Sequence, residues 1–100
     1  EGKKLVLFYA DWCGYCKKAH PEYQKVKDEY HGKHIKGMKV HFNDYEEKRD
    51  EHLIGKGKKY EVTGFPTIIV RTIKKGIELA PIQFNAITYD TMVEELEKIF

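Results

Sequence analysis

The fold and chemistry of this chain are decided by one stretch, Trp12-Cys13-Gly14-Tyr15-Cys16. It holds both cysteines of the sequence, separated by two residues, and it follows the apolar run Leu5-Val6-Leu7-Phe8-Tyr9. The residues after it have a helical pattern of apolar positions. A buried strand that gives way to a helix at such a pair is typical of a thiol redox site.

The size and composition of the chain limit what it can be. One hundred residues predict a single domain over 1–100, and 41% hydrophobic residues suffice for a buried core. The net charge of +2 does not favour a nucleic-acid surface, and no apolar run reaches the length of a membrane span. We expect a monomer that binds neither nucleic acid nor membrane.

The cysteine count points to reactivity rather than to a structural role. A bridge between Cys13 and Cys16 would close a very short loop and add little stability. No signal peptide is visible, which favours a cytoplasmic location. If the chain is an excised domain, the endoplasmic reticulum or another oxidising compartment is the alternative.

The first half of the chain has the pattern of a strand, a helix and a strand. We predict strands over 4–10 and 39–42, joined by a helix over 14–30 whose apolar face is Cys16, Ala19, Tyr23, Val26 and Tyr30. Such a βαβ unit implies parallel strands and a right-handed crossover. Asp44 and Glu47 resemble a capping box, so we predict a further helix over 45–54.

The second half has the pattern of two strands and a helix. We predict strands over 67–73 and 77–84, with a turn at Lys75-Gly76 and with Pro81 placing the second strand at the sheet edge. A helix from Asp90 to the end has the apolar face Met92, Val93, Leu96, Ile99 and Phe100. The prediction is an α/β fold, βαβ then ββα, with a central mixed sheet flanked by helices.

The spacing of the cysteines suggests different roles for the two thiols. At the start of a helix, Cys13 faces unpaired backbone amides and the positive end of the dipole, which favour a nucleophilic thiolate. Cys16 lies one turn further along, where it can resolve a mixed disulfide on Cys13. Gly14 leaves room for a substrate, and Tyr15 lies between the two thiols.

Other uses of two cysteines are less well supported by the sequence. A zinc site of Cys13, Cys16 and His20 lacks a fourth ligand, so no metal is expected. Covalent haem attachment needs a histidine where Lys17 stands. Two inert, buried cysteines remain the simplest alternative, and an iron–sulfur cluster shared between two chains stays open without support.

Two segments resemble the thioredoxin superfamily, and protein disulfide isomerase domains in particular. They are Phe8-Tyr9-Ala10-Asp11-Trp12-Cys13-Gly14-Tyr15-Cys16-Lys17 with Pro21-Glu22-Tyr23, and Tyr60-Glu61-Val62-Thr63-Gly64-Phe65-Pro66-Thr67. The resemblance implies a thioredoxin-like fold and a cis bond between Phe65 and Pro66, with the proline facing the cysteine pair. It also implies a substrate groove lined by Trp12, Gly14, Tyr15, Phe65 and Pro66.

Several positions depart from the pattern of this family. The chain starts almost on the active-site strand, so the N-terminal strand and helix are expected to be absent. Leu7 stands where the family has a buried acid, which leaves proton transfer to water. Ala86 and Thr88 stand where disulfide isomerases have Gly and Arg. Among the histidines, only His20 is a candidate to tune Cys16.

The resemblance implies a thiol–disulfide oxidoreductase in which Cys13 attacks and Cys16 resolves. No organic cofactor is expected, because the cysteine pair carries the electrons. The expected partners are protein thiols and disulfides, with a thioredoxin-reductase-type or glutathione reductant. The alternatives are a non-enzymatic thioredoxin-fold binding module and, because Tyr15 also occurs in glutaredoxins, a glutathione-dependent reductase.

Overall fold

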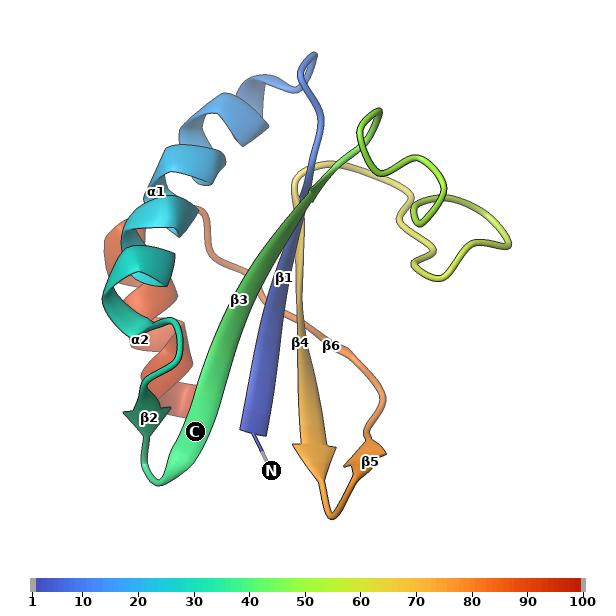
Figure 1. Ribbon diagram of the computed structural model, residues 1–100. Coiled ribbons are helices and arrows are strands. Elements are labelled where there is room, and N and C mark those ends of the chain that lie inside the picture. The colour runs from blue at the N-terminus through green and yellow to red at the C-terminus, as the bar shows by residue number, and fades with distance from the viewer. Residues whose placement is uncertain (1, 100) are drawn as a thin grey trace.

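The structure is a computed structural model that describes residues 2–99. One mixed sheet has both helices packed on the same side of it (Figure 1). Along the chain the elements are β1 (Gly2–Tyr9), α1 (Gly14–Tyr30), β2 (His34–Ile35), β3 (Met38–Glu46), β4 (Thr67–Lys74), β5 (Ile77–Glu78), β6 (Ile82–Gln83) and α2 (Tyr89–Ile99). The predicted α/β class with a mixed sheet is confirmed.

Strand β1 lies at the centre of the sheet. It pairs in parallel with β3 and antiparallel with β4, and the strand order is β2-β3-β1-β4-β5, with β6 also paired to β4. The predicted βαβ unit is therefore confirmed. The short strand β2 was not predicted. It forms a hairpin with β3 through Lys36 and Gly37, both with positive φ (49° and 83°), as a tight hairpin turn requires.

Both faces of β1 are covered, which explains its unbroken apolar run. Leu5 and Leu7 pack with residues of the two helices, including Tyr23 and Met92. Val6 and Phe8 point to the opposite face and pack with Ile54 and Tyr60. These last two belong to the long segment between β3 and β4, which lies on the side away from the helices in Figure 1.

Helix α1 has the predicted bounds and buries the predicted face except for Tyr30, which is only half-buried. Cys16, Ala19, Tyr23 and Val26 are its buried residues, and the helix continues through Pro21. Glu22 joins the two helices, since its Oε1 accepts a hydrogen bond of 3.2 Å from the backbone N–H of Tyr89. Helix α2 starts one residue earlier than predicted, and the predicted contribution of Phe100 lies outside the described residues.

The predicted helix over 45–54 is wrong. Strand β3 continues to Glu46, and turns follow it. Tyr45 stays in the sheet because its ring stacks on Phe8, with centroids 5.9 Å apart. Beyond it, side chains take the backbone donors that a helix would use. Asp50 accepts from the N–H of Glu46 at 2.9 Å, and Glu46 accepts from that of Arg49 at 3.1 Å.

The predicted strand over 77–84 is broken in two. Strands β5 and β6 each pair with β4 for two residues, and Leu79 after β5 still donates its N–H to the carbonyl of Thr72 in β4 at 2.8 Å, so the interruption falls just before β6, at Pro81. Proline has no N–H to donate to a ladder, which accounts for the interruption. The turn at Lys75-Gly76 is confirmed, with φ of 53° and 76°.

Tyr23 ties α1 to two strands at once, and this contact predicts a loss of stability on mutation. Its fully buried hydroxyl lies 3.0 Å from the carbonyl oxygen of Leu5 and 2.7 Å from that of Asn43. Tyr23→Phe removes the single hydroxyl proton that these two carbonyls share. We expect the free energy of unfolding in urea to fall by about 1–3 kcal/mol.

Tyr15→Phe is the matched control, because Tyr15 is 70% exposed. It should change the free energy of unfolding by less than about 0.5 kcal/mol. Equal small effects in the two variants would contradict a structural role for the Tyr23 hydroxyl.

Candidate active site

Cys13 is the N-cap residue of α1. Its backbone is extended (φ −85°, ψ 116°), and its Sγ accepts a hydrogen bond of 3.2 Å from the backbone N–H of Cys16. The turn that leads into the helix is closed by the N–H of Cys13, which donates to the carbonyl of Ala10 at 3.2 Å. The sulfur therefore lies at the end of the helix where the dipole favours negative charge.

Cys16 lies deeper than Cys13, and its thiol holds its proton more tightly. It is 2% exposed and, like Cys13, is a free thiol. Burial, then the hydrogen bond with Cys13, raises the pKa of Cys16 to about 12, while the backbone of Ala10 acts in the opposite direction. The two sulfurs thus have clearly different surroundings, which is the arrangement that an attacking and a resolving thiol require.

Three of the predicted groove residues lie around the cysteine pair. Trp12 and Tyr15 are among the most exposed large side chains, at 66% and 70%. Phe65 packs against the cysteines and meets the Trp12 ring edge to face, with centroids 5.9 Å apart. Trp12 Nε1 also donates to Glu47 Oε1 at 2.8 Å, a contact that the sequence did not predict.

The two smaller groove residues are placed differently. A Cβ built on Gly14 would meet no atom within 4 Å, so the surface above the first helical turn is open. The peptide bond between Phe65 and Pro66 is cis. Pro66 lines a cavity of about 320 Å³ together with Ile68, Gln83, Phe84, Asn85, Ala86 and Ile87.

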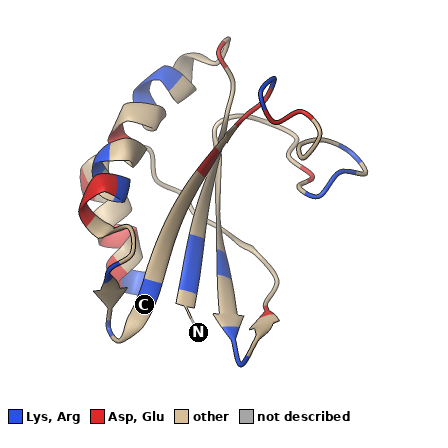
Figure 2. Cartoon of the chain, in the orientation of Figure 1, with Lys and Arg blue, Asp and Glu red and all other residues tan. Residues whose placement is uncertain are grey.

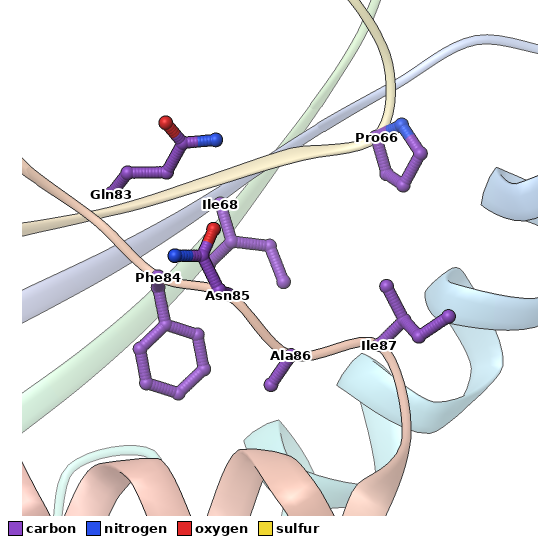
Figure 3. Close-up of a pocket in the computed structure, with 7 residues that line it drawn as sticks. All are labelled: Pro66, Ile68, Gln83, Phe84, Asn85, Ala86 and Ile87. Atoms are coloured by element: carbon purple, nitrogen blue, oxygen red, sulfur yellow. The ribbon is translucent and has the colours of Figure 1, made fainter.

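Sequence reasoning missed most of this cavity. Figure 3 shows Ile87 directed toward Pro66 across the opening, with Ile68 and Ala86 along the wall. Asn85 and Ile87 belong to the segment between β6 and α2, which carries no motif that could have identified it. Ala86, which stands at the expected glycine, is part of the same wall.

Thr88 has a structural role in place of the arginine that the family pattern led us to look for. Its Oγ1 accepts from the N–H of Thr91, and its N–H donates to Thr91 Oγ1, each at 3.3 Å. This reciprocal pair is a capping arrangement for α2. The residue therefore secures the start of a helix and brings no positive charge to the site.

A second cavity lies beside Cys16. It has a volume of about 240 Å³, and its lining residues are Tyr9, Ala10, Asp11, Cys16, Lys17, His20 and Pro21. The ring of His20 stacks on that of Tyr9, with centroids 4.2 Å apart and an interplanar angle of 20°. His20 Nε2 lies 3.6 Å from Asp44 Oδ2. Asp44 had been assigned to a helix cap, so its place here was not foreseen.

The interior of the site contains no acid. Leu7 is fully buried, and within residues 2–99 no Asp, Glu, Lys, Arg or His side chain is buried. Among the same residues, no group of three or more His, Cys, Asp or Glu side chains is arranged to hold a metal ion. The groups available for a reaction are the two thiols and the side chains around them.

Comparison with known proteins identifies the family. The thioredoxin family model matches residues 1–98. The chain belongs to the thioredoxin family. It is 35% identical over 99 residues to a mitochondrial thioredoxin domain-containing protein of Schizosaccharomyces pombe, covering 98% of this chain and 24% of that protein. It is 34% identical over 99 residues to protein disulfide-isomerase A5 of Mus musculus, covering 97% of this chain and 17% of that protein.

Solved structures agree with the fold. The Trx4 domain of ERdj5 superimposes with a TM-score of 0.71 at 21% identity, covering 98% of this chain and 79% of that chain. The first thioredoxin domain of mouse protein disulfide-isomerase A4 has a TM-score of 0.66 at 25% identity, covering 99% and 64%. The thioredoxin-like fold of disulfide isomerase domains is therefore confirmed.

The relatives do not support the expected cytoplasmic location. One is described as mitochondrial, and several are disulfide isomerases. The chain spans about a quarter or less of the length of the curated relatives described above, 24% and 17%. Within residues 2–99, neither helix is long and apolar enough to cross a membrane.

The difference between the two thiols predicts selective alkylation. Iodoacetamide reacts with thiolates, and a thiol with a pKa of about 12 is almost entirely protonated at neutral pH. We expect Cys13 to be modified first at neutral pH. Cys16 should react only as the pH rises toward about 12. Tandem mass spectrometry of the tryptic peptide that contains both residues would locate the modification.

The same reaction in concentrated urea is the control. Unfolding removes the burial that raises the pKa of Cys16, so both cysteines should then react at similar rates. Rapid modification of Cys16 in the folded protein at neutral pH would contradict the unequal environments.

Proposed function

We propose that this domain is a thiol–disulfide oxidoreductase that exchanges disulfides with protein substrates through Cys13 and Cys16. The observation that carries the proposal is the position of the Cys13 sulfur. It caps α1 at the open end of the helix and accepts the N–H of Cys16 at 3.2 Å. Family membership and the disulfide isomerases among the relatives support the same activity.

The proposed reaction has two exchange steps. The thiolate of Cys13 attacks one sulfur of a substrate disulfide, and the other substrate sulfur leaves with the electron pair and takes a proton from solvent. Cys16 then loses its proton and attacks Cys13. The bond between Cys13 and the substrate breaks, and a Cys13–Cys16 disulfide forms. The substrate gains two electrons, the cysteine pair loses two, and no organic cofactor takes part.

The proposed substrate groove consists of Trp12, Gly14, Tyr15, Phe65 and Pro66. The aromatic rings offer apolar contact area, and the open surface above Gly14 admits a substrate backbone. The cavity beside Pro66 extends this groove toward Ile87 and can accept an apolar side chain (Figure 3). We propose extended segments of proteins as substrates, and a thioredoxin-reductase-type protein or glutathione as the reductant.

We propose an oxidising compartment as the place of this activity. Disulfide substrates persist in such compartments, whereas cytosolic thiols are kept reduced. The relatives named as disulfide isomerases support this choice over the cytoplasm.

A second candidate function is a binding module that performs no redox chemistry. The buried Leu7 and the capping role of Thr88 favour it, since neither residue can move a proton or supply a charge. A glutathione-dependent reductase, for which Tyr15 is the main support, is the third candidate. It requires that activity depend strictly on glutathione.

Replacing each cysteine tests the proposed roles. Cys13→Ser should abolish reduction of a protein disulfide, because the attacking thiolate is lost. Cys16→Ser should accumulate mixed disulfides between Cys13 and its substrates, which non-reducing electrophoresis would detect. Tyr30→Phe, far from the pair at the end of α1, should behave as the wild type. Retained activity in Cys13→Ser would exclude the proposed reaction.

Equilibration in glutathione redox buffers separates an oxidoreductase from a binding module. We expect a reversible two-electron transition between the dithiol and the Cys13–Cys16 disulfide, measured by acid quenching, alkylation and mass. The midpoint of this transition would also show whether the domain favours reduction or oxidation of substrates. Cysteines that never exchange would instead support the binding module.

A further inference from the structure

The cavity beside Cys16 is lined by both a thiol and an imidazole. Both Cys16 and His20 line its volume of about 240 Å³. A cavity needs only roughly 10–15 Å³ to hold one water molecule, so this one has room for several. Its polar wall groups give such waters hydrogen-bond partners.

Helix geometry directs the imidazole toward the sulfur. His20 follows Cys16 by four residues on α1, a spacing that puts the two side chains on one face with Cβ atoms about 5–6 Å apart. Side chains on a helix lean toward its N-terminus, so His20 leans over the turn that carries Cys16. Water in the cavity can therefore connect the ring with the thiol.

Three side chains hold the imidazole in this place. The Tyr9 ring covers one of its faces at a centroid distance of 4.2 Å. On its edge, Nε2 lies 3.6 Å from Asp44 Oδ2 and 3.3 Å from Gln24 Nε2. The amide nitrogen of Gln24 can only donate, so Nε2 is the acceptor in the neutral ring, and the Asp44 carboxylate beside it stabilises a proton that arrives on this nitrogen.

Asp44 reaches His20 because of the register of the sheet. It pairs with Leu7 across the parallel β1–β3 ladder, and it continues the alternation of Val40 and Phe42, which face the helices. Figure 2 shows acidic residues in the C-terminal half of β3, beside α1. The other carboxylate oxygen, Oδ1, pairs with Lys27 Nζ at 3.1 Å, so each oxygen of Asp44 has a partner.

We propose that His20, oriented by Asp44, moves the proton of Cys16 through water in this cavity. The inference rests on the proposed function and names the proton acceptor for its second step. The thiol of Cys16 gives its proton to a water molecule, which passes one to the lone pair of His20 Nε2, beside Asp44 Oδ2. The resulting thiolate forms the bond to Cys13, and the electron pair of the broken bond leaves on the substrate sulfur. In the reverse direction the imidazolium returns the proton to Cys16.

Other charged or titratable groups surround the imidazole. They are Tyr9 and Asp11 from the end of β1 and its turn, Cys16, Lys17 and Lys27 from α1, and Asp44, Glu46 and Arg49 from β3 and the turn after it. Burial raises the pKa of Tyr9, so its phenol keeps its proton at neutral pH. A lysine ammonium has no lone pair to accept a proton. Asp11 is the competing acceptor, because its carboxylate lines the same cavity.

The experiment measures the two exchange steps separately. The reduced full chain is mixed with an aromatic disulfide that releases coloured thionitrobenzoate. The first release reports attack by Cys13, and the second reports attack by Cys16 on the mixed disulfide. At neutral pH we expect His20→Gln to slow the second release by roughly a hundredfold, the low end of what positioned general bases contribute, and to leave the first unchanged.

Matched variants separate proton transfer from a structural effect. Asp11→Asn and His34→Gln should keep both rates within about twofold of the wild type, since one removes the competing carboxylate and the other an exposed histidine of β2. Asp44→Asn should slow only the second release. The pH dependence of that release should differ between the wild type and His20→Gln, because the variant lacks the group that accepts the proton.

Added imidazole provides a readout that a structural role would not move. In His20→Ala, imidazole in the buffer should restore the second release in proportion to its concentration, and it should not accelerate the wild type. A second release in His20→Gln within about twofold of the wild type at every pH would overturn the proposal, as would its loss in Asp11→Asn. Absence of the first release from the wild type would instead contradict the proposed function itself.

Discussion

The structure depends on the burial of β1 on both faces. A strand with helices on one side and an ordered segment on the other must be apolar throughout, as Leu5 to Phe8 are. The remaining polar atoms of this strand belong to its backbone. One of them, the carbonyl oxygen of Leu5, accepts a hydrogen bond from the hydroxyl of Tyr23 on α1. The same burial fixes where β1 ends, and the first turn of α1 begins there with the cysteine pair.

Burial of this kind also shapes the chemistry. An apolar strand end lowers the polarity around Cys16, and its thiol keeps a proton that the reaction must remove. With Leu7 on β1, the nearest acid on the helix-facing side is on the neighbouring strand, at Asp44. The negative charge therefore lies on Asp44 of β3 and not on the central strand. There the carboxylate is partly exposed, and Lys27 and His20 contact it.

Local sequence patterns predicted the elements whose residues contact each other at regular spacing. The bounds of α1 and the parallel β1–β3 pair followed from apolar periodicity, and the turn at Lys75-Gly76 from its residue types. The prediction of a helix over 45–54 failed because Glu46 and Asp50 bind the backbone locally, which a pattern of charges cannot distinguish from a capping box.

In the site, Trp12 to Cys16 were visible as one motif. The approach of Asp44 to His20, and of Ile87 to Pro66, depends on sheet register and on a connecting segment without a motif.

Trp12 contacts both ends of the long segment that covers the outer face of β1. Its indole nitrogen binds Glu47, where the segment leaves β3, and its ring meets Phe65, where the segment returns to β4. One exposed side chain thus closes a surface loop whose inner residues, Ile54 and Tyr60, help to bury Phe8. A bound polypeptide that shifts the Trp12 ring disturbs both anchors together, so occupancy of the groove and order in this loop are coupled through a single indole.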